Sequence, residues 1–284
     1  MESAARSGTL VIGDLTVNRM GYGAMRITGP GIWGDPPDPE ASKGVLRRAV
    51  ELDVNFIDTA AAYEASERLI GEALAPYADG LVIATKAGHY RTGPDEWHID
   101  SSREAIRRQT EQSLHDLRVE CLDLQQLHRV DPNVPIEESV GALKELQDEG
   151  KVRHIGVSNV TVAELRRAQS VASIVAIQNE YNLADRRSDD VVEACEADGL
   201  AFLPWFPLRA GRLTASGGAL DRVAAKHAGT PAQVALAWLL HQSPIMLVIP
   251  GTNSTEHLVE NVAAAGLRLD DEDLTLLSPW RAGE

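Results

Sequence analysis

The sequence predicts an α/β protein, a single parallel (β/α)8 TIM barrel over residues 1–284 with an N-terminal β-hairpin. Two observations support this prediction. Short apolar runs alternate with amphipathic segments along the whole chain, and parallel neighbouring strands need such crossovers. Eight of these repeats in about 250 residues match a closed barrel better than an open sheet. No linker or low-complexity segment indicates a second domain.

The expected hairpin comes first in the chain. Residues 10–12 and 15–17 are short strand-like segments, and Gly13-Asp14 between them supplies a two-residue turn. The eight apolar runs that we expect to form the barrel strands are 20–25, 55–58, 81–86, 122–127, 152–158, 175–178, 200–205 and 246–249.

The segments between the runs have the features of helices. Segment 101–117 begins with a Ser pair able to cap it and has Glu104 in its first turn. Segment 135–147 starts with Pro and stops before Gly150, the usual asymmetry of helix ends. The other expected helices are 40–52, 161–169, 188–197, 231–241 and 255–265.

The main alternative fold is a doubly wound open sheet. Gly21-Tyr22-Gly23 continues as Ala24-Met25-Arg26, so the third glycine of the dinucleotide-binding fingerprint is missing, which argues against this fold. Two loops, 28–39 and 87–100, are longer than the others. Long irregular loops in compact domains are usually functional or disordered, so these two loops are candidates to border a site.

The composition excludes several classes of partner. Lys and Arg total 27 against 42 Asp and Glu, and a net charge of -15 repels nucleic acid. The two cysteines form neither a disulfide framework nor a zinc spacing, so we expect no metal and a cytoplasmic location. We find no signal peptide and no apolar stretch near the roughly 20 residues that span a membrane. We expect a monomer or simple homo-oligomer that acts on a small molecule.

Four titratable side chains lie at or just after the ends of successive apolar runs. Asp58 ends the second run and Tyr63 follows it, Lys86 ends the third run, and His128 follows the fourth. Each residue alone has an ordinary structural explanation, such as a helix cap or a core histidine. Because the C-terminal strand ends of a barrel share one mouth, where chemistry takes place, the set indicates an active site.

These residue types suit the reduction of a carbonyl by hydride. Negative charge builds on the carbonyl oxygen, which then takes up a proton. Tyr63 can donate that proton, and Lys86 would lower the phenol pKa from its ordinary value of roughly 10. Asp58 would pair with Lys86, and His128 would donate a hydrogen bond to the substrate oxygen. This chemistry requires no metal.

At these residues the sequence resembles the aldo-keto reductase family. The matching stretches are 57–63, 84–86, 127–128, 151–159 and 249–252, and the resemblance covers nearly the whole chain. It implies an oxidoreductase that reduces a small aldehyde or ketone to an alcohol with the Asp58, Tyr63, Lys86 and His128 tetrad. Stretches 20–25, 178–182 and 206–208 resemble a bacterial group of the family that includes pyridoxal reductase, so pyridoxal is one candidate substrate.

The resemblance also implies the residues that hold the cofactor, with NADP(H) preferred and NAD(H) as the alternative. Ser158, Asn159 and Gln178 would bind the nicotinamide carboxamide, and Trp205 would stack on the nicotinamide ring. The helix that starts near residue 255 offers its N-terminus to a phosphate. The other implied cofactor residues are Gly23, Met25, Asp58, Phe206, Pro207, Leu208, Arg209, Arg212, Gly251, Thr252, Asn253, Ser254, His257, Glu260 and Asn261.

The sequence departs from the family pattern near the expected phosphate site. Gly251 stands where many members have Lys, and His257 stands where many have Arg, which argues against a strong NADPH preference. Arg209 and Arg212 are candidates to supply the missing charge, with ordinary surface arginines as the alternative. The chain ends at residue 284, without the long tail of other members, so we expect a shallower substrate pocket bounded mainly by Trp33, His89, Tyr90 and Trp97. The alternative is that these aromatic side chains only pack their own loops.

Two other functions stay open. One is a nicotinamide-binding sensor or accessory subunit with little turnover, although the intact tetrad argues against a pure binder. The other is an aldolase in which Lys86 forms a Schiff base. That chemistry needs a neutral Lys86, whereas a nearby Asp58 favours the charged form.

Overall fold

The computed structural model describes residues 2–208 and 218–278. Arg209 and Arg212, two of the expected cofactor residues, lie outside the described residues. Within those two ranges, no helix has both the length and the apolar character that crossing a membrane requires.

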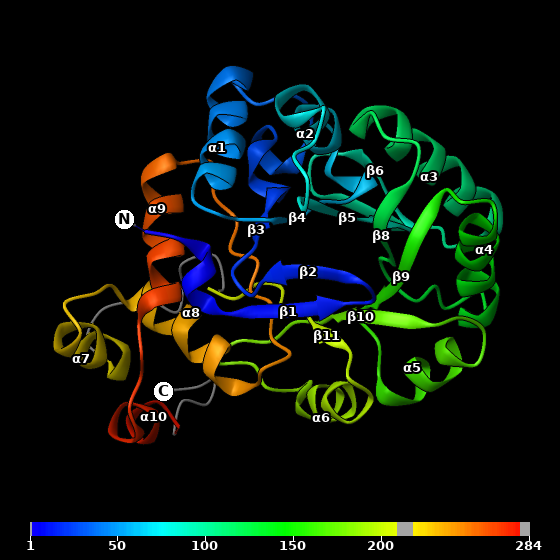
Figure 1. The fold of residues 1–284 in the computed structure, drawn as a ribbon. Coiled ribbons are helices and arrows are strands. Elements are labelled where there is room, and N and C mark those ends of the chain that lie inside the picture. Colours follow the sequence, from blue (N-terminus) through cyan, green and yellow to red (C-terminus); the bar gives the residue numbers. More distant parts are fainter. Residues whose placement is uncertain (1, 209–217, 279–284) are drawn as a thin grey trace.

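A curled parallel sheet forms the centre of the molecule (Figure 1). In the described part of the chain it has seven strands, and their spatial order, β11-β10-β9-β8-β5-β4-β3, follows the chain order. The predicted alternation of parallel strands and crossover helices is therefore confirmed. The strands are β3 (Tyr22–Gly23), β4 (Phe56–Asp58), β5 (Val82–Ala87), β8 (Leu122–Leu127), β9 (Val152–Ser158), β10 (Ile174–Gln178) and β11 (Ala201–Phe202).

The predicted eighth strand, residues 246–249, is not a regular strand. It joins the two edges of the sheet through isolated parallel bridges, from Met246 to Phe202 of β11 and from Val248 to Met20 beside β3. The backbone N–H of Leu247 donates to the oxygen of Phe202 over 3.0 Å. The predicted run 200–205 is also shorter than expected, and Pro204 within it has no N–H to extend the ladder.

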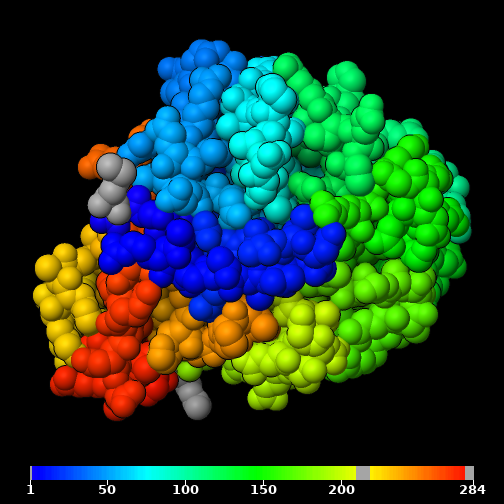
Figure 2. Space-filling view, in the orientation of Figure 1, coloured from blue at the N-terminus to red at the C-terminus, as the bar shows by residue number. Residues whose placement is uncertain are grey.

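Two N-terminal strands, β1 (Thr9–Ile12) and β2 (Leu15–Asn18), pair antiparallel as predicted, and Gly13 in the turn has a φ of 62°. Their buried side chains Ile12, Leu15 and Val17 pack into the sheet interior against a cluster that includes Phe56, Val82, Ala84, Leu124, Ala176, Leu203 and Leu247. Figures 1 and 2 show this pair lying across one end of the curled sheet and covering its centre. A site at the sheet axis must therefore open at the other end.

Helices surround the sheet (Figure 1). The sequence analysis predicts most of them but not α2, α7 and α10, which are short. The α-helices are α1 (Pro39–Glu51), α2 (Ser66–Leu74), α3 (Arg103–Leu117), α4 (Ile136–Asp148), α5 (Val162–Gln169), α6 (Asp189–Asp198), α7 (Ala219–Lys226), α8 (Pro231–Gln242), α9 (Thr255–Ala263) and α10 (Asp271–Leu277). Short 3-10 turns are η1 (Ala4–Ser7), η2 (Ala24–Ile27), η3 (Pro30–Ile32), η4 (Ala61–Tyr63) and η6 (Ala264–Gly266).

The expectation of an irregular loop over 87–100 is wrong. This segment contains two antiparallel strands, β6 (His89–Gly93) and β7 (Glu96–Ile99), which form a second hairpin. Its first strand buries alternate residues, His89, Arg91 and Gly93. The two-residue period of a half-buried strand explains the regular structure, although aromatic and turn residues made the segment look like a loop.

Candidate active site

A cavity of ≈ 1180 Å³ lies at the C-terminal ends of the parallel strands. Asp58 ends β4, Ser158 ends β9 and Gln178 ends β10, and all three side chains reach the cavity wall. The full wall consists of Gly23, Met25, Arg26, Asp58, Tyr63, His89, Trp97, Ile99, His128, Arg129, Ser158, Asn159, Gln178, Trp205, Phe206, Pro207, Leu208, Ile249, Pro250, Gly251, Thr252 and Asn253.

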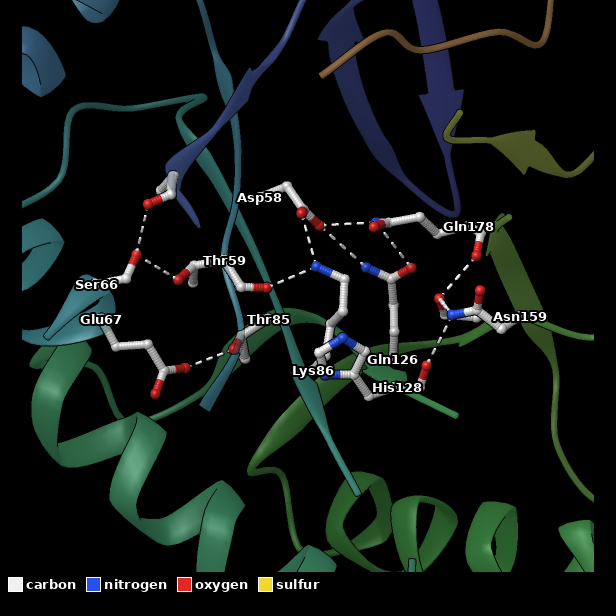
Figure 3. A network of polar contacts seen from close by, with 12 residues as sticks. Asp58, Thr59, Ser66, Glu67, Thr85, Lys86, Gln126, His128, Asn159 and Gln178 are labelled. Atoms are coloured by element: carbon white, nitrogen blue, oxygen red, sulfur yellow. Dashed lines mark hydrogen bonds and ion pairs between the residues drawn. The ribbon is translucent and has the colours of Figure 1, made fainter. Parts of the chain in front are cut away.

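Lys86 and Asp58 form a buried ion pair on neighbouring strands. The Nζ atom of Lys86 lies 2.6 Å from Oδ2 of Asp58 and donates to the backbone oxygen of Thr59 over 2.8 Å (Figure 3). The two side chains are 1% and 5% exposed. Burial by itself lowers the pKa of Lys86, but Asp58 and Tyr63 together raise that pKa above its ordinary value. Lys86 is therefore held as an ammonium, which does not suit a Schiff base.

The second carboxylate oxygen of Asp58 accepts hydrogen bonds from two glutamines. Gln178 donates to Oδ1 over 2.9 Å, and Gln126 donates to the same atom over 3.4 Å (Figure 3). The sequence analysis missed Gln126, whose signal was a polar residue inside the apolar strand β8. These donors fix the carboxylate, so Asp58 in turn fixes the position of Lys86.

Tyr63 belongs to the η4 turn that follows β4. Its ring meets the His128 ring edge-on, with centroids 5.8 Å apart, and Lys86 Nζ lies 5.3 Å from the Tyr63 centroid. Burial raises the pKa of the Tyr63 phenol, and the charge of Lys86 opposes this effect without cancelling it. Lys86 therefore acts on this pKa in the expected direction, but the net pKa of Tyr63 is raised rather than lowered, because desolvation is the larger influence. The protonated phenol can act as a proton donor.

Two neutral imidazoles lie side by side at the cavity wall. The rings of His128 and His89 have centroids 4.6 Å apart. Burial and the charge of Lys86 hold the pKa of His128 well below its ordinary value. Burial and the charge of Arg129 lower the pKa of His89 to about 4. Each Nδ1 is buried and has no hydrogen-bond partner within residues 2–208 and 218–278.

The residues expected to bind a carboxamide form one connected group. Asn159 donates to Ser158 Oγ over 2.8 Å and to the backbone oxygen of His128 over 3.1 Å. Its own amide oxygen accepts a hydrogen bond of 3.0 Å from Trp205 Nε1. Ser158 Oγ donates to the backbone oxygen of Gln178 over 2.7 Å. Amide, hydroxyl and indole groups thus meet on one side of the cavity.

The remaining expected cofactor residues divide into two groups. Gly23, Met25, residues 206–208 and residues 251–253 are all in the cavity wall. Four residues of the α9 region are not in the wall, namely Ser254, His257, Glu260 and Asn261. Ser254 caps α9 by accepting a hydrogen bond from the N–H of His257, and the Glu260 carboxylate accepts one from Thr230 Oγ1.

The expected substrate-pocket aromatics divide in the same way. His89 and Trp97 are in the cavity wall, whereas Trp33 and Tyr90 are not. Tyr90 instead stacks on His98 at a centroid distance of 5.1 Å. The wall also contains residues that the sequence analysis missed, which are Arg26, Ile99, Arg129, Ile249 and Pro250. Arg26 and Arg129 directly follow wall residues that it did assign.

Comparisons with known proteins show the family of the chain. A model of the aldo/keto reductase family matches residues 19–279. The chain is 47% identical over 271 residues to the Schizosaccharomyces pombe protein named uncharacterized oxidoreductase C215.11c, covering 95% of this chain and 88% of that one. It is 43% identical over 279 residues to pyridoxine 4-dehydrogenase of Escherichia coli, covering 95% and 97% of the two chains.

A solved structure extends the comparison to the whole fold. An aldo/keto reductase from Klebsiella pneumoniae in complex with NADP and acetate has a TM-score of 0.82 and 28% identity, with 97% of this chain and 96% of that one covered. The family model and the relatives span most of the chain, so the predicted resemblance is confirmed: this chain belongs to the aldo/keto reductase family.

Proposed function

We propose that this chain is an NAD(P)H-dependent oxidoreductase that reduces the carbonyl of a small aldehyde or ketone to an alcohol, with Tyr63 as the general acid. One observation carries the proposal. A protonated tyrosine, a neutral histidine and a buried Lys86–Asp58 pair meet at the mouth of one cavity. Carbonyl reduction needs a proton donor, a hydrogen bond to the oxygen and a cation beside the acid.

The cavity wall fits a nicotinamide cofactor. The amides of Asn159 and Gln178 and the hydroxyl of Ser158 can pair with a carboxamide, and the Trp205 indole can face an aromatic ring. A bound nicotinamide would supply the hydride that reaches the carbonyl carbon. The protein's own residues then act on the oxygen.

Each member of the tetrad has a separate role. The phenol of Tyr63 gives its proton to the carbonyl oxygen, and the ammonium of Lys86 stabilises the phenolate that this transfer leaves. Asp58 keeps Lys86 charged and in place. Neutral His128 donates a hydrogen bond to the same oxygen, which orients the carbonyl before the proton moves.

The proposal includes a preference of the protein for NADP(H) over NAD(H). Gly251 has no side chain that could supply a positive charge, but Arg26 lies beside it. A Cβ atom built on Gly251 would be 3.8 Å from Cγ of Arg26. Arg26 is exposed at the cavity wall, where its guanidinium can reach a phosphate. We expect Arg26→Gln to raise the dissociation constant of NADPH much more than that of NADH. His257→Ala tests the second residue expected at the adenosine 2'-phosphate, which NADPH has and NADH lacks. Equal effects on the two cofactors would show that the substituted residue does not bind that 2'-phosphate.

Pyridoxal is the first substrate to test, because a relative at 43% identity is named pyridoxine 4-dehydrogenase. The decisive experiment measures NADPH and NADH oxidation with pyridoxal and a panel of aldehydes and ketones, for the wild type, Tyr63→Phe and Tyr90→Phe. Tyr90 is an exposed tyrosine outside the cavity wall and serves as the matched control. We expect Tyr63→Phe to bind NADPH normally and to lose most turnover, while Tyr90→Phe stays active.

Other results would have clear meanings. A fully active Tyr63→Phe variant would show that Tyr63 is not the acid. Normal NADPH binding by the wild type without turnover of any panel member would favour a nicotinamide-binding sensor over a reductase.

A further inference from the structure

We propose that the carbonyl end of the cavity contains a second subsite, formed by Arg129 and His89, that binds an anionic oxygen next to the carbonyl of the substrate. This inference rests on the proposed reductase function, which places the carbonyl oxygen at Tyr63 and His128. The favoured substrate class is a planar aromatic aldehyde with a negatively charged oxygen substituent beside the aldehyde group.

Arg129 provides the positive charge of the subsite. It directly follows His128, lies in the cavity wall and is partly exposed. Its backbone oxygen accepts a hydrogen bond of 3.1 Å from Ser101 Oγ, which anchors the main chain. Among the residues that the structure describes, the guanidinium has no ion pair or hydrogen-bond partner. Its charge also affects the pKa values of Tyr63, His89 and His128, so it acts on all three from close by.

The acidic residues around Arg129 are engaged elsewhere. Asp131, two positions along the chain, accepts hydrogen bonds from the backbone N–H groups of Ser101 and Asn133. Asp58 is paired with Lys86. The guanidinium is therefore free to bind an anion from the cavity. On a protein with a net charge of -15, a local cation is also what allows an anionic substrate to bind.

His89 provides a neutral donor next to this charge. His89 is the first residue of β6, is 8% exposed, and lines the cavity. Its Nδ1 is fully buried, so Nε2 would be the nitrogen that donates to a ligand in the cavity. The position of its ring is fixed by His128 on one side and by Trp97, at a centroid distance of 5.7 Å, on the other. An imidazole kept neutral offers one N–H to an anion and does not repel the adjacent guanidinium.

The spacing of the rings indicates the substrate class. The centroids of His89 and His128 are 4.6 Å apart, so two oxygens bound by these rings belong to neighbouring substituents. Trp97 lies edge-on to Tyr63 at 6.4 Å and contributes an aromatic wall. Flat aromatic substrates pack well against such a wall. An anionic oxygen in charge-assisted hydrogen bonds with Arg129 would then add both affinity and orientation.

A matched set of aldehydes tests the subsite. The set is 2-formylbenzenesulfonate, its uncharged analogue 2-(methylsulfonyl)benzaldehyde, and benzaldehyde. We expect kcat/KM of the wild type to favour the sulfonate over the uncharged analogue by about tenfold or more. Arg129→Met should abolish this preference, measured as the ratio of kcat/KM for the sulfonate to kcat/KM for the uncharged analogue, so that any change in turnover common to both aldehydes cancels. Arg129→Lys should keep part of the preference, and His89→Leu should reduce it. Arg47→Met, which removes an exposed arginine on α1, is the control for net charge.

Two kinetic results would overturn the subsite. One is equal turnover of the charged and uncharged aldehydes by the wild type, and the other is a preference that persists in Arg129→Met. Calorimetric binding of 2-(hydroxymethyl)benzenesulfonate, the product alcohol, tests the subsite without turnover. If no aldehyde is reduced but Arg129→Met still abolishes this binding, the reductase proposal fails and the subsite stands. Equal binding by wild type and variant would overturn the subsite alone.

Discussion

Glu67 is a buried carboxyl group that should make the stability of the protein depend on pH. It is the second residue of α2, is 3% exposed, and accepts a hydrogen bond of 2.5 Å from Thr85 Oγ1 (Figure 3). Burial raises the pKa of Glu67 to about 7 from an ordinary value of 4.5. The charge of Asp116 acts in the same direction, and that of Lys86 opposes it.

The sign of the effect follows from which state binds the proton more tightly. Below the ordinary pKa, Glu67 is protonated in both the folded and the unfolded state, and its full stabilising contribution to the free energy of unfolding is present. Between the ordinary pKa and about 7 the unfolded chain releases this proton while the folded protein keeps it, so the free energy of unfolding falls as pH rises. The total loss is about 3 kcal/mol, because one pKa unit corresponds to about 1.4 kcal/mol.

The variant Glu67→Gln tests this reasoning, because glutamine keeps an oxygen acceptor for Thr85 but does not titrate. Urea unfolding from pH 4.5 to 8 should show Glu67→Gln gaining about 3 kcal/mol relative to the wild type. The control is Glu104→Gln, which changes an exposed glutamate at the second position of α3. If the free energies of unfolding of the wild type and Glu67→Gln differ by the same amount at every pH, Glu67 does not have a raised pKa.

Three further predictions concern the site and its supports. Lys86→Met should lower the free energy of unfolding by about 3–5 kcal/mol, because it leaves Asp58 buried without its cation. Adding Asp58→Asn to Lys86→Met should restore much of the lost free energy of unfolding in urea. If the double variant is no more stable than Lys86→Met, the ion-pair argument fails. Arg91→Met removes the guanidinium that lies 4.0 Å from the centroid of the Trp97 ring, so the KM for aromatic aldehydes should rise several-fold while the dissociation constant of NADPH stays unchanged. A parallel rise in this KM and in the NADPH dissociation constant would indicate general damage to the fold. Ile12→Ala should lower the free energy of unfolding by about 2–5 kcal/mol in thermal or urea unfolding, because Ile12 is fully buried, and should leave kcat unchanged. A decrease below about 1 kcal/mol would refute the packing role of Ile12.

Much of the site could be predicted because it depends on strand ends. Asp58 ends a strand and His128 follows one, and parallel strands bring such positions to one mouth whatever the surrounding details are. The hydrogen bonds that hold these residues in place depend on how side chains pack in the folded protein, and strand order does not predict them. Gln126 belongs to the support of Asp58, but in the sequence it is only a polar residue within an apolar run.

The second hairpin shows a different limit of sequence analysis. The segment 87–100 has Gly, Pro and aromatic residues and was expected to be irregular, yet β6 and β7 pair through it. Arg91 holds β6 against the distant η3 turn through hydrogen bonds to the backbone oxygens of Gly31 and Ile32. Such a partner 60 residues away leaves no local signal.

The amino-acid sequence by itself determined the order of strands and helices, the N-terminal hairpin, and the four titratable residues at the strand ends, because these depend on local periodicity and on chain order. Only the tertiary structure decided their electrostatic state. The pKa of Tyr63 is raised rather than lowered, two histidines are kept neutral, and Arg26 and Arg129 face the cavity. These properties arise from desolvation and from charges brought close by folding, and neither is encoded in the spacing of residues along the chain.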